Sequence, residues 1–197
     1  MSETDYIILR KTPFRESSLI VSGITPEYGR LDFIMRGYSS GKNGKFSIAG
    51  SFRELHVEFK SKKEDLSGLL TAGKIELVTN HDSIAENIPG YLAACNLSPV
   101  ILANTAPMIP VPGTYQALKL FLRAVQNGKA PEPYESFVRL MLLCEAGELP
   151  VQEGRAGDFL NHLLDRISSG EDIPDGIPLS YWKNLTEWRK VVCRKLQ

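Results

Sequence analysis

The glycine-rich, basic stretch MRGYSSGKNGKFS (residues 35–47) contains residue types that could act on a phosphate group. P-loops bind nucleotide phosphates with such residues, but they need four residues between the first glycine and the Gly-Lys pair, followed by Ser or Thr. Here three residues separate Gly37 from Gly41, and Asn43 follows Lys42. A strand-like segment, rather than a helix, comes next. The stretch is therefore predicted to be a loop that presents lysine cations, not a nucleotide site.

Other arrangements that could support catalysis or metal binding are weak in this sequence. The three histidines are not spaced as a helical metal pair, and the three cysteines contain no C-x-x-C pair. These residues are His56, His81, His162, Cys95, Cys144 and Cys193. We expect the cysteines to be small apolar residues on helices in a reducing compartment. The sequence thus predicts a protein that is not an enzyme, with no metal and no cofactor.

The composition is that of an ordinary globular protein. The chain has 197 residues, 43% of them hydrophobic, and its formal net charge is zero. The total charge alone therefore gives no reason to expect nucleic-acid binding. The N-terminus lacks a signal-peptide pattern, and no apolar run approaches the roughly 18 residues of a membrane span. We expect a cytoplasmic protein without a membrane partner.

The first 80 residues have the pattern of short strands. In FRELHVEFK, Leu55, Val57 and Phe59 alternate with polar residues, as in a strand with one buried face. Three β-branched or aromatic runs, YIILR, SSLIVSGIT and RLDFIM, precede it, and LLTAGKIELV follows. Pro26 and Gly29 occupy turn positions between the second and third runs. About five short strands joined by glycine-rich loops predict a small closed barrel.

Helical spacing replaces alternation after Asn80. Residues 114–126, 134–147, 158–167 and 180–196 are predicted helices, joined in part by the proline-rich connector PMIPVPG at 107–113. Thr114 is a predicted N-cap, and Gly147 a predicted stop. The expected fold is α+β: a β-barrel domain over residues 1–80 followed by an all-α helical bundle over 81–197.

Positive charge is concentrated on the predicted barrel. Residues 30–63 contain eight basic and three acidic residues, a local excess of five positive charges. The bases are Arg30, Arg36, Lys42, Lys45, Arg53, Lys60, Lys62 and Lys63. Tyr38 and Phe46 lie among them and are candidates for stacking on bases, as single-strand binders require, whereas Phe33 fits the core better. The simpler alternative is that Lys60, Lys62 and Lys63 solvate a loop or an edge strand.

The order of motifs in residues 5–150 resembles that of the recombination mediator RecO. The similar segments are IILR at 7–10, RESSLIV at 15–21, TPEYGRL at 25–31, MRGYS at 35–39 and VRLMLLCEAGELP at 138–150. The resemblance implies that the barrel is an OB-fold. Arg36, Tyr38 and Ser39 stand where the family often has Lys, Ala and Arg. The four-cysteine zinc module that typically follows the last motif is absent here.

The resemblance also implies a function, partners and a nucleoid-associated location. RecO-like proteins bind single- and double-stranded DNA, anneal complementary strands, bind the C-terminal tail of the single-strand-DNA-binding protein, and with RecR help to load RecA in the RecF pathway. The candidate DNA-binding residues are Arg10, Arg30, Arg36, Tyr38, Lys42, Lys45, Lys60, Lys62 and Lys63. Arg10 and Arg30 have a structural alternative, because either could pair with Asp5, Glu16 or Glu27.

The predicted last helix offers a candidate site for a partner peptide. Lys183, Lys190 and Arg194 fall on one stripe with Glu187 between them, beside which an acidic, apolar-tipped peptide tail could bind. The alternative is that these cations only favour the helix dipole.

Two other functions remain open at this stage. One is a non-catalytic protein-interaction module whose DNA surface has weakened. The other is a small-molecule enzyme on an OB-like barrel, although no set of candidate catalytic residues in the sequence supports it.

Overall fold

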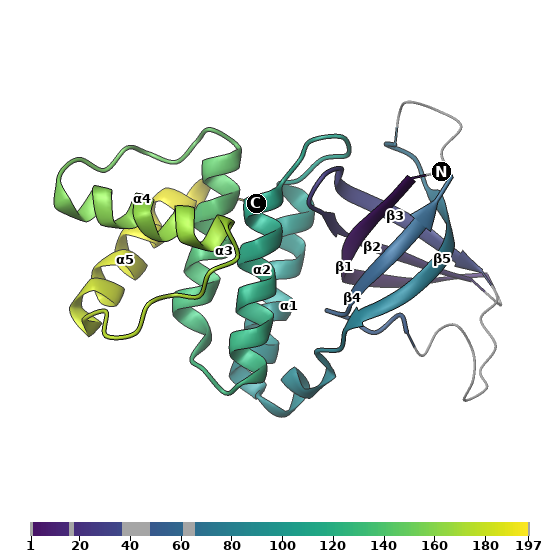
Figure 1. The fold of residues 1–197 in the computed structure, drawn as a ribbon, viewed down its shortest axis with the longest axis horizontal. Helices are drawn as coiled ribbons and strands as arrows, with labels where there is room; N and C mark the ends of the chain where they lie inside the picture. Colours follow the sequence, from purple (N-terminus) through teal and green to yellow (C-terminus); the bar gives the residue numbers. More distant parts are fainter. Residues whose placement is uncertain (1, 16–17, 37–47, 61–65, 197) are drawn as a thin grey trace. The chain divides into compact units, whose positions relative to one another are not determined.

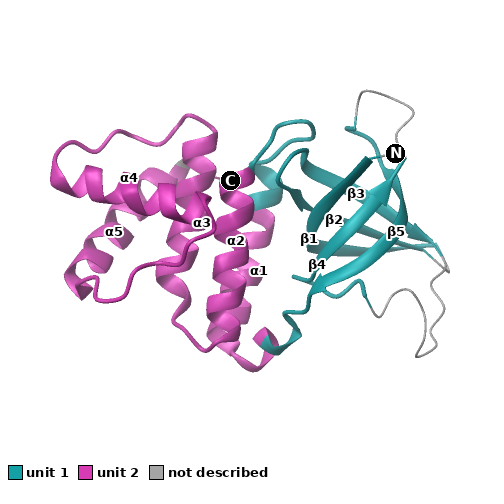
Figure 2. Ribbon diagram, viewed as in Figure 1, with its two compact units in different colours: residues 1–83, 101–111 teal, residues 84–100, 112–197 magenta. Residues whose placement is uncertain are grey.

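The protein divides into two compact units, which are coloured separately in Figure 2. A computed structural model describes residues 2–15, 18–36, 48–60 and 66–196. The first unit comprises residues 1–83 and 101–111, and the second comprises 84–100 and 112–197. The segment 101–111, which comprises the last residues of the first α-helix and the connector to the second, thus groups with the strands.

The first unit is a closed five-stranded barrel, as the sequence predicts (Figure 1). Its strands are β1 (Ser2–Phe14), β2 (Ser18–Thr25), β3 (Gly29–Arg36), β4 (Glu54–Phe59) and β5 (Leu70–Thr79). They pair in the order β1-β2-β3-β5-β4, and β4 returns to β1. All pairs are antiparallel except β3 with β5.

The barrel core follows the alternation in the sequence. Leu55, Val57 and Phe59 are fully buried, which confirms the face assigned to them. Phe33 packs edge-on against Phe59, with ring centroids 5.4 Å apart. Tyr6 is also fully buried, and its hydroxyl lies 3.0 Å from the carbonyl oxygen of Val21, which accepts its hydrogen bond. Burial raises the pKa of Tyr6 well above its ordinary value, so this hydroxyl keeps its proton.

The β2–β3 turn has the geometry that its sequence predicts. Gly29 has φ +67°, a conformation that favours glycine, and the Thr25 hydroxyl accepts a hydrogen bond from the Tyr28 amide at 2.9 Å. The connector from 101 to 111 lies against this turn. Its Met108 amide donates to the Tyr28 carbonyl at 2.8 Å, and Gly29 forms a β-bridge with Pro107. These bonds explain why the connector belongs to the first unit.

The second unit is helical. After the short 3-10 helix η2 (Asp82–Glu86) come α1 (Ile88–Ala103), α2 (Pro112–Gln126), α3 (Pro131–Glu145), α4 (Arg155–Ser168) and α5 (Leu179–Val192), which the 3-10 helix η3 (Cys193–Lys195) follows. α2 packs on α3 and α4, and α3 packs on α5. α2 is the most buried of these helices, with ten buried residues among 15 against eight among 15 in α3. Gly147 after α3 has φ +70°, as a helix stop requires.

Three local predictions need correction. Thr114 is not an N-cap: α2 already begins at Pro112, and the Thr114 hydroxyl donates to Glu145 of α3 at 2.6 Å. Cys95 and Cys144 lie on helices but are exposed, because each falls on the outer face of its helix. The last α-helix ends at Val192, and Cys193 lies in η3.

Candidate nucleic-acid interface

The predicted DNA-binding residues fall into three groups in the structure. Arg10, Arg36 and Lys60 are exposed on the barrel. Arg30 is partly buried, and its Nη1 donates to the Leu102 carbonyl at 3.0 Å, so it holds the connector to the barrel. The remaining residues, Tyr38, Lys42, Lys45, Lys62 and Lys63, lie outside the described residues. Arg10 contacts Ser22 Oγ with Nη2 at 3.4 Å, so the described contacts of Arg10 and Arg30 are not with Asp5 or Glu27.

Strand register brings Arg10 and Arg36 onto one face of the barrel. Residues directly opposite each other in antiparallel strands point to the same side of a sheet. Three rows run across β1, β2 and β3: Arg10–Ser22–Asp32, Thr12–Ile20–Ile34 and Phe14–Ser18–Arg36. We call these nine positions the β1–β2–β3 outer face. The intervening positions Val21 and Phe33 point the other way, into the core.

The end of β1 extends the basic character of this region. β1 is buried as far as Leu9 and then exposed from Arg10 to Pro13, while it still pairs with β2 up to Phe14. Lys11 lies on this extension and Arg15 follows it, and both are exposed. Neither residue was singled out by the sequence analysis. The signal was present in the run RKTPFR, but its relation to Arg36 depends on pairing across three strands.

The opposite side of the barrel is acidic. On β1, β4 and β5 the outward positions carry Glu3, Asp5, Glu58 and Glu76, together with His56 and Lys74. Asp5 Oδ1 lies 2.9 Å from His56 Nδ1, and Lys74 Nζ lies 2.6 Å from Glu76 Oε1. Negatively charged groups are repelled by this side, whereas Arg10 and Arg36 outnumber Asp32 on the β1–β2–β3 outer face. The barrel therefore carries its basic and acidic residues on different sides, although the whole chain has a formal net charge of zero.

His56 makes the stability of this acidic side depend on pH. The hydrogen bond that the His56 ring donates to Asp5 is the main cause of a raised His56 pKa, with a smaller contribution from Glu3. Because the folded pKa is above the unfolded value, the stabilisation is complete below about pH 6.5 and disappears as pH rises through the folded pKa. We expect an NMR titration of the His56 ring to show this raised pKa, and Asp5→Asn to lower it. An unchanged His56 pKa in Asp5→Asn would contradict the assignment of the cause.

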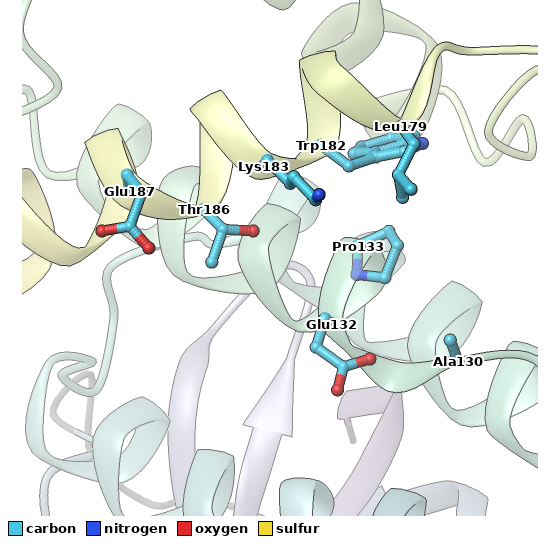
Figure 3. Close-up of a pocket in the computed structure, with 8 residues that line it drawn as sticks. All are labelled: Ala130, Glu132, Pro133, Leu179, Trp182, Lys183, Thr186 and Glu187. Carbon is cyan, nitrogen blue, oxygen red and sulfur yellow. The ribbon is translucent and has the colours of Figure 1, made fainter.

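A separate pocket in the helical unit involves one of the predicted peptide-binding residues. The pocket has a volume of about 460 Å³ and lies between the start of α3 and α5 (Figure 3). Its lining is Ala130, Glu132, Pro133, Leu179, Trp182, Lys183, Thr186 and Glu187. Lys183 projects from α5 toward α3 beside Trp182. Lys190 does not line the pocket but holds Glu187 Oε1 at 2.7 Å, and exposed Arg194 lies beyond the end of α5 in η3.

The described residues add two observations about other kinds of site. They contain no group of three or more His, Cys, Asp or Glu side chains placed to hold a metal ion. In the same part of the chain, the helices are all too short or too polar to cross a membrane.

Comparison with known proteins defines the class of the barrel. A family model described as the N-terminal domain of recombination protein O matches residues 1–78, a range that ends within β5. The matched region is the OB-fold domain of that family, and the closed five-stranded barrel agrees with it.

Curated relatives extend the similarity into the helices. A DNA repair protein RecO of Listeria monocytogenes is 25% identical over 171 residues, which cover 86% of this chain and 66% of the relative. A DNA repair protein RecO of Cellvibrio japonicus is 26% identical over 165 residues, 83% of this chain and 64% of the relative. The chain thus spans slightly less than two thirds of the length of these relatives. Residues 1–78 thus match the N-terminal domain of recombination protein O, and the similarity to RecO proteins continues into the helices.

Proposed function

We propose that this chain is a non-enzymatic mediator of DNA repair and recombination that binds DNA on the β1–β2–β3 outer face. The observation that carries the proposal is the register that places Arg10 and Arg36 on one face, with exposed Arg15 directly after the end of β1. The names of the relatives, DNA repair protein RecO, support the same role.

The chemistry of this face suits binding with little sequence preference. Arginines bind phosphate oxygens, while Ser18 and Thr12 offer small hydroxyl groups that leave the backbone of a strand room to approach. Contacts of this kind serve single and double strands alike. Bringing two strands together for annealing needs cations that offset phosphate repulsion and no bond chemistry. Help in loading RecA together with RecR is the wider role that the family resemblance suggests.

The test is a salt series of fluorescence-polarisation titrations with a labelled single-stranded oligonucleotide. Each lost phosphate contact lowers the log–log salt slope by roughly 0.7 on a single strand. Arg10→Gln/Arg36→Gln should therefore lower it by about 1.4 and weaken binding roughly ten-fold or more near 50 mM salt.

The matched control for this test is Arg123→Gln, which removes an exposed arginine from α2 in the helical unit. This variant should bind like the wild type. An unchanged salt slope in the double variant would show that DNA does not bind on this face. If the wild type itself failed to bind at low salt, the DNA-binding proposal would be wrong.

The α3–α5 pocket supports a second role, as the site for a protein partner. We propose that it binds an acidic, apolar-tipped peptide such as the tail of the single-strand-DNA-binding protein. Leu179 is 69% exposed at its edge and Trp182 lines it, so an apolar tip has surface to bury. Lys190 pairs with Glu187, whereas Lys183 and Glu132, the other charges of the lining, form no ion pair with another described residue. If DNA binding proves weak, this pocket favours the protein-interaction module.

The expected result for this pocket is that Lys183→Glu weakens binding of a labelled acidic peptide roughly ten-fold, measured by fluorescence polarisation. The physical reason is that a cation near the peptide carboxylates is replaced by a like charge. Arg155→Glu changes the same charge on exposed α4 and should have no such effect. Equal loss in both variants would show that only the overall charge matters and that the pocket is not the site.

A further inference from the structure

Phe14 is an aromatic residue at the free end of the basic extension of β1. It is the last residue of the strand, and its side chain is half-buried. The guanidinium carbon of Arg15 lies over its ring, 5.2 Å from the centroid. Arg15 itself is exposed, and its φ of +57° is unusual for a residue other than glycine. The end of β1 therefore places an exposed arginine over an aromatic ring.

The position of Phe14 argues against a role in the barrel core. The core cluster includes Val21 and Met35, with Leu19 packed against it, and Phe14 is not among its members. Phe14 lies instead in the row Phe14–Ser18–Arg36, on the outer face. Its immediate neighbour in that row on β2 is Ser18, a small residue.

The same row also contains a cation for the phosphate. Adjacent strands are about 4.8 Å apart, which places Phe14 and Arg36 roughly 10 Å from each other across the ribbon. A short stretch of single strand can span that distance with a base at one end and a phosphate at the other. Aromatic rings and planar guanidinium groups both accept a stacked base, whatever its identity.

We infer that Phe14 and Arg15 form a base-stacking platform that makes the β1–β2–β3 outer face prefer unpaired DNA bases over duplex. This inference rests on the proposed function and names the feature of DNA that the site selects. In a duplex the bases are already stacked inside the helix, so only their phosphates reach the face. In a single strand a free base can lie against the platform.

The test compares three probes: a single-stranded thymidine oligonucleotide, an abasic oligonucleotide of the same length, and a duplex. Phe14→Leu should lose roughly ten-fold in affinity for the thymidine strand and little for the other two probes. Its salt slope should not change, because no phosphate contact is removed. Arg15→Lys keeps the charge but not the planar group, and it should lose part of the same base-dependent affinity.

Phe14→Trp is the second variant, since it retains a stacking ring and adds an indole reporter. It should keep the affinity of the wild type, and its added fluorescence should be quenched by the thymidine strand and not by the abasic strand. If the wild type and Phe14→Leu bind the thymidine strand equally well, the proposal of base stacking on Phe14 is contradicted. The proposal that DNA binds on the β1–β2–β3 outer face is not affected by that result. An equal loss of the thymidine and abasic strands would also overturn it. Failure of the wild type to bind any probe would overturn the proposed function along with it.

Discussion

Replacing Gly23 by alanine is expected to destabilise the barrel by about 2–3 kcal/mol, because its methyl group has no space. An added Cβ would overlap the Ile7 carbonyl oxygen of the paired strand and lie 2.8 Å from the Tyr6 ring. The first obstacle is backbone and the second is a fully buried side chain, so neither can move aside. Gly23 thus allows β1 and β2 to cross closely just before the bulge between Ile8 and Arg10.

Hydrogen exchange of the barrel amides is the suitable measurement for this change. Both tryptophans lie in α5, so tryptophan fluorescence reports on the other unit. A loss of 2–3 kcal/mol should speed exchange in β1, β2 and β3 roughly 30- to 150-fold. Gly68→Ala is the control, since an added Cβ there meets no atom within 4 Å. Equal protection in the Gly23 variant and the wild type would show that β1 and β2 can separate without cost.

Replacing Glu145 by alanine is expected to cost about 2–3 kcal/mol in the helical unit. Its carboxylate accepts hydrogen bonds from the Gly113 amide at 2.7 Å, from the Thr114 amide at 3.0 Å and from the Thr114 hydroxyl. These amides are in the first turn of α2, where helical donors have no partner within the helix. The negative charge also favours the N-terminal end of the helix dipole. Glu145 therefore joins the end of α3 to the start of α2.

Urea unfolding followed by tryptophan fluorescence measures this effect directly. Glu145→Gln retains one acceptor oxygen without the charge and should lose about half as much stability. Glu153→Gln, at an exposed position after α3, should unfold like the wild type. The account of the capping contact would be contradicted if Glu145→Ala matched the Glu153 variant.

Much of the fold could be predicted from local sequence. Alternation at Leu55, Val57 and Phe59 and the turn glycine Gly29 reflect rules that act over a few residues, and the structure has both as expected. Thr114 shows where such rules fail. Its type and position suit an N-cap, yet a carboxylate 31 residues away takes that role. No local pattern reveals a partner so distant in the sequence.

The sequence predicted that the barrel is basic, but not which residues lie together on one of its faces. The excess of basic residues pointed to the barrel, and Arg10 and Arg36 lie on one of its faces. Arg30 is also an arginine, but its guanidinium donates a hydrogen bond to the Leu102 carbonyl, 72 residues away in the sequence. Phe14 was missed because its place beside Ser18 and Arg36 depends on strand register, which residue types alone do not specify.

The central claim is that DNA lies on the β1–β2–β3 outer face. Photo-cross-linking of the wild-type chain to a single strand carrying a photoreactive thymidine, followed by mass spectrometry of the linked peptides, tests it most directly. We predict cross-links to residues of the end of β1, the start of β2 and the end of β3, with Phe14 prominent among them. Cross-links confined to α2–α5, or to the acidic side around His56, would contradict the claim.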